Sequence, residues 1–199
     1  MGIRLPNGRA RNYWRLPIAL LAVVLTVGFS CSKKSDTDLA NEALAKGIAA
    51  QNAGQLAEAA ADYRDVLVHD PNNKYAYFDL GLIDQTNGAL ASAESNYRLA
   101  LSIDPLFVSA LYNLAIVRHD QGDLKEAIDL YQRAIKAQPD YASAHLNLGF
   151  ALIEAHRDQE GKAELKVAVQ LNPDFASRVK GANSEPSATA SESPSASPS

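Results

Sequence analysis

The sequence predicts an all-α fold, specifically an α-solenoid built from antiparallel helix pairs. The first observation is a period of 34 residues that runs through most of the chain. A fixed period of this size is typical of repeat proteins, in which each unit buries its apolar face by stacking on the next. The second observation is that several residue types keep the same step. They are Pro71, Pro105, Pro139 and Pro173; Gly54, Gly88 and Gly122; and Tyr63, Tyr97 and Tyr131.

Each unit reads as two helices of about 13–14 residues joined by a turn, and the third unit shows this most clearly. Apolar residues recur there at helical spacing until Gly122 interrupts the pattern. Asp123 is expected to cap the second helix, with Glu126 in the capping-box position. Pro139 would end that helix, because proline lacks a backbone donor and clashes with the preceding turn. With proline at position 32, the four units span residues 40–73, 74–107, 108–141 and 142–175.

Small residues recur at positions 8 and 20 of the units, where a larger side chain would overpack two closely approaching helices. Leucine recurs at position 7, tyrosine at position 24 and proline at position 32. This pattern resembles the tetratricopeptide repeat (TPR) family, with three clear units and one degenerate unit. The small residues are Gly47, Gly81, Ala115 and Gly149 at position 8, and Ala59, Ala93, Ala127 and Gly161 at position 20.

Both ends of the repeat array depart from the family pattern towards polar residues. The first unit has Lys46 at position 7, and the fourth has His156 and Asp158 at positions 15 and 17. Polar terminal units are expected in a solenoid, because its end faces meet water.

The resemblance implies a concave face for binding a protein or peptide, lined by positions 2, 5, 6, 9, 12 and 13 of each first helix. Positions 5 and 9 are apolar in all four units, which favours docking of an amphipathic helix or extended peptide. The asparagines at position 6 could bond a bound peptide backbone. The predicted partner-binding residues are Ile48, Phe78, Leu82, Tyr112, Asn113, Ile116, Asn147 and Phe150.

Two alternatives stay open for these positions. The apolar residues at positions 5 and 9 could instead pack between neighbouring first helices. At position 11, Asp84 and Arg118 could pair across adjacent units, or both could reach water along their apolar stems.

Residues 1–31 are expected to form a signal or anchor segment. Four arginines precede a short apolar run, which is the pattern of a secretory signal, and Cys31 follows that run directly. The arrangement resembles a bacterial lipoprotein signal, which implies lipid attachment at Cys31. An uncleaved transmembrane anchor and ordinary cleavage are the alternatives. All three place the repeats on the extracytoplasmic side, periplasmic or cell-surface, with the cell membrane or outer membrane as the site of a tether.

The two remaining segments are polar. Residues 32–39 are expected to be a linker. Residues 181–199 are rich in serine and proline and bury too little apolar surface to offset their ordering entropy, so a disordered tail is expected. Three interpretations of this tail stay open: a plain unfolded end, a spacer, or a substrate for O-glycosylation.

Charge and motifs argue against several classes of function. Residues 40–175 contain 11 Lys and Arg against 19 Asp and Glu, and an acidic solenoid repels phosphate backbones, so no nucleic-acid partner is expected. The four histidines lack metal-ligand spacing, and no nucleophile elbow or phosphate-binding loop occurs. We therefore expect no enzyme, no cofactor and no metal.

The leading hypothesis is an exported, membrane-tethered scaffold that holds a peptide or helix of a partner envelope protein, with its acidic character favouring basic partners. The alternatives are a self-associating structural component and an accessory subunit of an envelope biogenesis enzyme complex.

Overall fold

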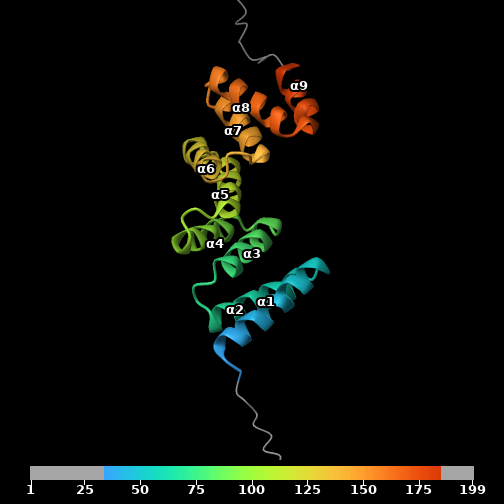
Figure 1. The fold of residues 1–199 in the computed structure, drawn as a ribbon, viewed down its shortest axis with the longest axis vertical. Helices are drawn as coiled ribbons and strands as arrows, with labels where there is room; N and C mark the ends of the chain where they lie inside the picture. The colour runs from blue at the N-terminus through green and yellow to red at the C-terminus, as the bar shows by residue number, and fades with distance from the viewer. Residues whose placement is uncertain (1–33, 185–199) are drawn as a thin grey trace, which may run out of the picture. The chain divides into compact units, whose positions relative to one another are not determined.

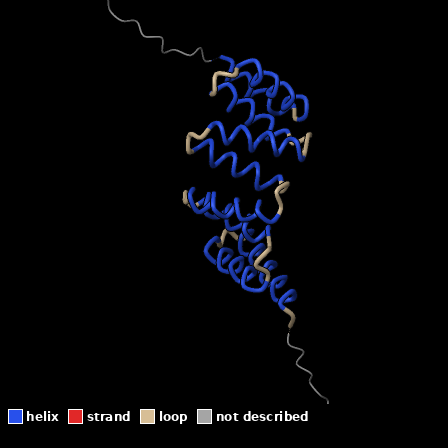
Figure 2. Tube along the Cα trace, turned by 90° about the vertical axis from the view of Figure 1, so that its left-hand side faces the viewer, coloured by secondary structure: helices blue, strands red, loops and turns tan. Residues whose placement is uncertain are grey.

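The computed structural model describes residues 34–184, and this part of the chain consists of helices joined by short turns (Figures 1 and 2). The prediction of an all-α fold is confirmed. In order, the elements are α1 (Asp36–Asn52), α2 (Leu56–His69), α3 (Lys74–Thr86), α4 (Leu90–Ile103), α5 (Val108–Asp120), α6 (Leu124–Ala137), α7 (Ala142–Glu154), α8 (Asp158–Leu171), the 3-10 helix η1 (Pro173–Phe175) and α9 (Ala176–Ser184).

The helices pack in the predicted pairs. Helix α1 packs on α2, α3 on α4, α5 on α6 and α7 on α8, and each pair contacts the next through α2 and α3, α4 and α5, and α6 and α7. Figure 1 shows the pairs following one another along the chain. The fourth unit, expected to be degenerate, keeps a complete helix pair.

The tyrosines at position 24 form the centre of the first three pairs. Tyr63, Tyr97 and Tyr131 are buried between the helices of their own units. The hydroxyl of Tyr63 donates to Gln51 Oε1 at 2.5 Å, and burial raises the pKa of that hydroxyl to about 12. The polar tip of a buried tyrosine is thus satisfied by the first helix, which fixes the register of the two helices.

The turns within the first three units require a left-handed backbone. Gly54, Gly88 and Gly122 have φ angles of 75°, 75° and 82°, and His156 occupies the equivalent position of the fourth unit with φ 59°. Glycine adopts this conformation freely, whereas a side chain with a Cβ is strained there. The fourth turn therefore keeps the geometry of the others at a cost in stability.

Replacing His156 by glycine should stabilise the protein by roughly 0.5–1 kcal/mol. Relief of the left-handed strain outweighs the larger backbone entropy that glycine has in the unfolded state. Thermal unfolding followed by circular dichroism measures the effect. The reverse change at the third turn, Gly122→His, is the matched control and should lower stability; a loss of stability in His156→Gly would contradict the strain argument.

The first helix begins four residues before the predicted unit, inside the segment 32–39 that the sequence suggested was a linker. The cause is a capping box. Ser35 Oγ accepts from the backbone N–H of Asp38 at 3.1 Å, and the Asp38 carboxylate accepts from the backbone N–H of Ser35 at 3.3 Å. These reciprocal bonds satisfy donors at the helix start and extend α1 towards the N-terminus.

The N-terminal cap of α6 was predicted in part. Asp123 Oδ1 accepts from the backbone N–H of Glu126 at 3.1 Å, as expected for an N-cap. The Glu126 side chain binds Arg98 and Arg118 instead of completing a capping box.

Two features at the C-terminal end were not predicted. Pro173 starts the 3-10 helix η1, and α9 follows it and runs to Ser184. Helix α9 includes the first four residues of the segment 181–199 assigned to the tail, and the rest of that segment lies outside the described residues. The signal or anchor segment 1–31, with Cys31, also lies outside them. Among the helices within residues 34–184, none has the length and apolar character needed to cross a membrane.

Candidate partner-binding face

The predicted contact residues lie on one face of the first helices α1, α3, α5 and α7, at positions 2, 5, 6, 9, 12 and 13, which we call the first-helix face. At position 5 the side chains pack against aromatic rings. The Phe78 ring lies 5.8 Å from the Tyr97 ring and 5.2 Å from the Phe107 ring, centroid to centroid.

The third unit repeats this arrangement. The Tyr112 ring lies 6.0 Å from the Tyr131 ring and 4.9 Å from the Tyr141 ring. In the fourth unit Leu146 is fully buried. These contacts favour the packing role at position 5 over contact with a partner.

At position 9 the four apolar residues differ in exposure. Ile48 is 46% exposed, whereas Leu82 and Ile116 are half-buried against the core of the second to fourth units. Phe150 packs against the buried cluster of Leu146, Leu165 and Ala168, as Phe175 and Val179 do. Ile48 is therefore the residue of this row that offers most apolar surface to a partner.

The asparagines at position 6 already bind acceptors of their own chain. The Asn113 amide donates to the backbone carbonyl of Ser109 at 2.8 Å, and the Asn147 amide donates to the Tyr112 hydroxyl at 3.0 Å. A peptide backbone would have to compete for these donors or use the amide oxygens.

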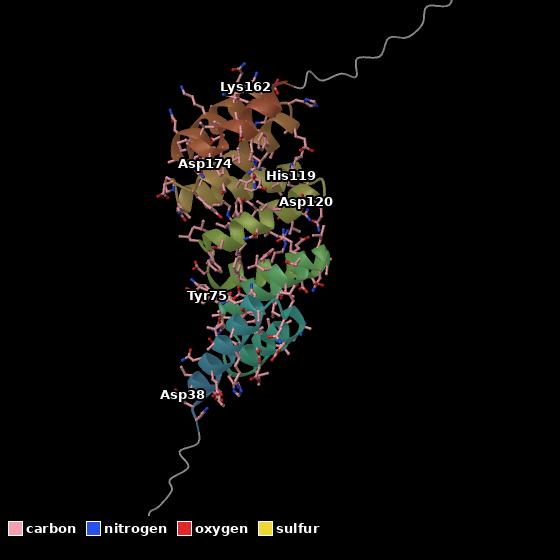
Figure 3. All side chains as sticks on the ribbon, turned by 90° about the vertical axis from the view of Figure 1, so that its right-hand side faces the viewer. Asp38, Tyr75, His119, Asp120, Lys162 and Asp174 are labelled. Carbon is pink, nitrogen blue, oxygen red and sulfur yellow. The ribbon has the colours of Figure 1, made fainter. Side chains whose placement is uncertain are left out.

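A small hollow of about 200 Å³ brings three of the predicted residues together. Helix α5 contributes Ile116, and α7 contributes Asn147 and Phe150; Tyr131, His119 and Asp120 complete the lining. Figure 3 shows His119 and Asp120 beside each other. His119 Nε2 lies 2.8 Å from a carboxylate oxygen of Glu154, which links α5 to α7 at this edge.

Asp79 stands at position 6 of the second unit, where the third and fourth units have asparagine. Its side chain is half-buried, and burial raises the pKa of the Asp79 carboxyl to about 6. Within the described residues no hydrogen bond or positive charge offsets this burial. Asp79 therefore adds a carboxylate to the first-helix face that is mainly ionised at neutral pH and mainly protonated below pH 5.

Two family models match this chain. One, described as "Tetratricopeptide repeat", matches residues 44–106, and the other, described as "TPR repeat", matches residues 117–154, so that together they cover half of the chain. The chain belongs to the tetratricopeptide repeat family.

Solved TPR structures share the fold. A MamA structure has a TM-score of 0.64 at 21% identity, over 71% of this chain and 83% of that one. PilF of Pseudomonas aeruginosa has a TM-score of 0.63 at 22% identity, over 70% of this chain and 64% of that one. The first TPR domain of Spaghetti (RPAP3), bound to the HSP90 peptide SRMEEVD, has a TM-score of 0.59 at 22% identity, over 61% of this chain and 97% of that one. The comparison with curated proteins returns no match.

The TPR fold is typically that of a protein-interaction scaffold. Within residues 34–184 there is no group of three or more His, Cys, Asp or Glu that could hold a metal ion. The coarser prediction, that this protein binds other proteins, agrees with its family.

One exposed aromatic residue on the TPR first-helix face was missed in the sequence. Tyr75, at position 2 of the second unit, is 51% exposed, and its ring packs edge-on against Phe107 at 5.6 Å. The Lys74 ammonium lies 5.2 Å from the Tyr75 ring, 5.0 Å from the Phe107 ring and 2.5 Å from an Asp104 oxygen, so its charge lies beside Tyr75 and is paired with Asp104. Position 2 is among the inward positions of the family, so the register alone could have identified Tyr75.

Neither expectation for Asp84 and Arg118 holds. Asp84 accepts a hydrogen bond from Asn96 at 2.8 Å. Arg118 lies among carboxylates of the second helices, at 3.2 Å from Glu94 and 2.7 Å from Glu126. The guanidinium therefore joins the second and third TPR units, because helix α4 brings Glu94 closer to it than α3 brings Asp84.

Proposed function

We propose that this chain is an exported, membrane-tethered TPR scaffold that holds a basic, partly apolar peptide or helix of a partner envelope protein on its first-helix face. The observation that carries the proposal is the chemistry of that face. Exposed apolar side chains, Ile48 and Tyr75, share it with the carboxylates of Asp79, Asp120 and Glu154. No lysine or arginine occupies positions 2, 5, 6, 9, 12 or 13 in any of the four units.

This chemistry favours basic, partly apolar partner segments over acidic ones. Burial of the apolar side chains supplies affinity at roughly 25 cal/mol per Å². The carboxylates attract lysine and arginine side chains and reject acidic segments. The HSP90 peptide held by the RPAP3 domain contains two glutamates and an aspartate. A face without positive residues suits the opposite class of peptide.

The membrane tether rests on the sequence of residues 1–31. A basic stretch, an apolar run and Cys31 together support export and lipid attachment. An anchored scaffold would present its binding face close to the membrane, where envelope proteins assemble.

Affinity capture of the tagged full-length chain from detergent-solubilised native membranes tests the proposal. The test variant is Ile48→Asp with Tyr75→Asp, since both side chains are about half exposed and neither belongs to the buried core. Leu82 and Ile116 are less suitable, because they are half-buried against the core. We expect a partner with wild type and at least about tenfold less of it with the variant, because two desolvated charges oppose docking.

The matched control is Val68→Asp with Leu106→Asp. These residues are 73% and 69% exposed and lie outside the first-helix face. The control should retain the partner, and circular dichroism should show equal helicity in all three proteins. Capture of the same proteins by all three would refute the binding face, and recovery of the chain only in the soluble fraction would refute the tether.

A further inference from the structure

A second recess lies at the C-terminal end of the repeats. It has a volume of about 680 Å³ and opens on the outer side of α8. Figure 3 shows Lys162 on the outer surface of this helix. We call it the α8 recess. Helices α8 and α9 supply its lining residues, which are Lys162, Leu165, Lys166, Val169, Gln170 and Val179.

In the earlier units the corresponding surface is covered by the next helix pair. Ile128, which stands at the position of Lys162, is only 7% exposed and belongs to the same core cluster as Ala144 and Leu148 of α7. Ala60 in the first unit is likewise buried, in a cluster with residues of α3. Helices α2, α4 and α6 thus each have a following helix packed on them.

Within the described residues helix α8 is followed by the short helix α9, whose Val179 packs on the buried cluster that includes Leu165 and Ala168. Helix α9 has 9 residues, compared with 13 in α3, α5 and α7. Both α8 and α9 pack on η1, and α9 contributes to the recess through Val179. The α8 recess therefore lies at the place where one more full-length helix of a solenoid would pack.

The charge of the recess limits what can occupy it. Lys162 and Lys166 lie four residues apart on α8, so their ammonium groups line the same side, and no carboxylate is among the described lining residues. Glu160 and Glu164 on the same helix are held by Arg157 and His145. Val169 and Val179, both half-buried, supply the apolar floor, whereas Leu165 is fully buried.

We propose that the α8 recess is a docking site for an amphipathic helix of a partner protein, with an apolar stripe flanked by acidic residues. Such a helix would cover the apolar floor as a following TPR helix does, and two of its carboxylates would meet Lys162 and Lys166. This site takes acidic helices, whereas the first-helix face suits basic segments, so the two surfaces would bind different partners.

Two other occupants fit less well. Residues 185–199 contain three prolines and no large apolar residue, so they cannot form an apolar helical stripe. A second copy of the chain would present α1, whose end face carries Lys46 paired with Glu42 where later units have leucine at position 7. That polar face does not match an apolar floor.

Fluorescence anisotropy with two designed peptides tests the site on the full-length chain in detergent. Both peptides have the same leucine stripe, flanked by glutamates in one and by lysines in the other. Wild type should bind the glutamate peptide at least about tenfold more tightly, and Lys162→Glu with Lys166→Glu should reverse that preference. The matched control, Lys125→Glu with Lys136→Glu, changes two exposed lysines of α6 and should keep the wild-type preference.

Each other outcome overturns the proposal. Equal binding of the two peptides by wild type would show that the lysines do not select a ligand. The same would follow if the variant Lys162→Glu with Lys166→Glu still preferred the glutamate peptide. Loss of binding in Ile48→Asp with Tyr75→Asp would place the peptide on the first-helix face instead. Tighter peptide binding after deletion of 185–199 would identify the tail as the occupant. A molar mass that rises with concentration in wild type, but not in the α8 variant, would identify a second copy.

Discussion

Replacing Gly161 by alanine should destabilise the protein by about 3 kcal/mol, the largest loss that we expect from adding one methyl group. A Cβ at this position would lie 2.6 Å from the backbone oxygen of Gly149 and 2.6 Å from Cγ1 of Ile153. Helices α7 and α8 approach closely here, since Leu165 replaces the bulkier tyrosine that the first three units have at position 24. A backbone atom cannot rotate away, so the helices themselves would have to separate.

Gly81→Ala is the matched control for this prediction. A Cβ on Gly81 would lie 2.5 Å from Cε1 of the Tyr97 ring, which is a comparable distance. The third unit, however, has Ala115 beside Tyr131 at the same two positions, so a small shift of the ring accommodates the methyl group. We expect a loss of at most about 1 kcal/mol, within the range for mild overpacking.

Chemical denaturation of both variants, monitored by circular dichroism, compares the two free energies of unfolding. Because each unit contacts only its neighbours, the Gly161 variant should also lose the fourth unit before the others. Limited proteolysis should then cut within 142–175 first. Equal destabilisation by the two variants would show that the clash with the backbone oxygen is not what limits this position.

Replacing Asp79 by asparagine should stabilise the protein at neutral pH and weaken binding of a basic partner. The pKa of the Asp79 carboxyl is raised to about 6 by burial, so the folded state holds the proton more tightly than the unfolded chain does. The stability associated with this proton is complete below about pH 4 and is lost as the pH rises through about 6. Asparagine avoids the loss, because its amide is neutral at every pH.

The gain should be about 1–2 kcal/mol at pH 7, after allowance for partial exposure, and should vanish near pH 4. The asparagine could also donate to the backbone carbonyl four residues earlier, as Asn113 does to Ser109. Thermal unfolding between pH 4 and pH 8 gives the pH dependence. Asp129→Asn, an exposed change on α6, is the control and should show no such pH-dependent gain.

The two effects of this variant separate a functional carboxylate from a structural one. If Asp79 meets a lysine or arginine of a partner, the variant loses affinity while it gains stability. A stable variant that binds a basic partner unchanged would remove Asp79 from the binding face, and a variant without any gain in stability would contradict the effect of burial.

The exposure of the N-terminal part of the candidate binding face could be predicted from the sequence, whereas much of the rest could not. Ile48 is exposed, as its position in the repeat suggested. The packing role of Phe78 could not be chosen in advance, because it depends on the approach of Phe107, almost one unit further along the chain. The Asn113 amide binds the Ser109 carbonyl one turn earlier in its own helix, whereas the Asn147 amide depends on the Tyr112 hydroxyl of α5, which only the packing of two units brings within reach.

The sequence by itself determined the helix pairs, their order and the positions of their turns. Those features follow from local chemistry: glycine where the backbone is left-handed, proline where a helix ends, and tyrosine and alanine at a fixed 34-residue spacing. Only the tertiary structure decided which charged side chains pair, how deeply Asp79 is buried and that, among the described residues, α8 is followed by the short helix α9 instead of a full-length repeat helix. The physical reason is that ion pairing, burial and end exposure depend on distances between helices, and those distances arise only when the units pack together.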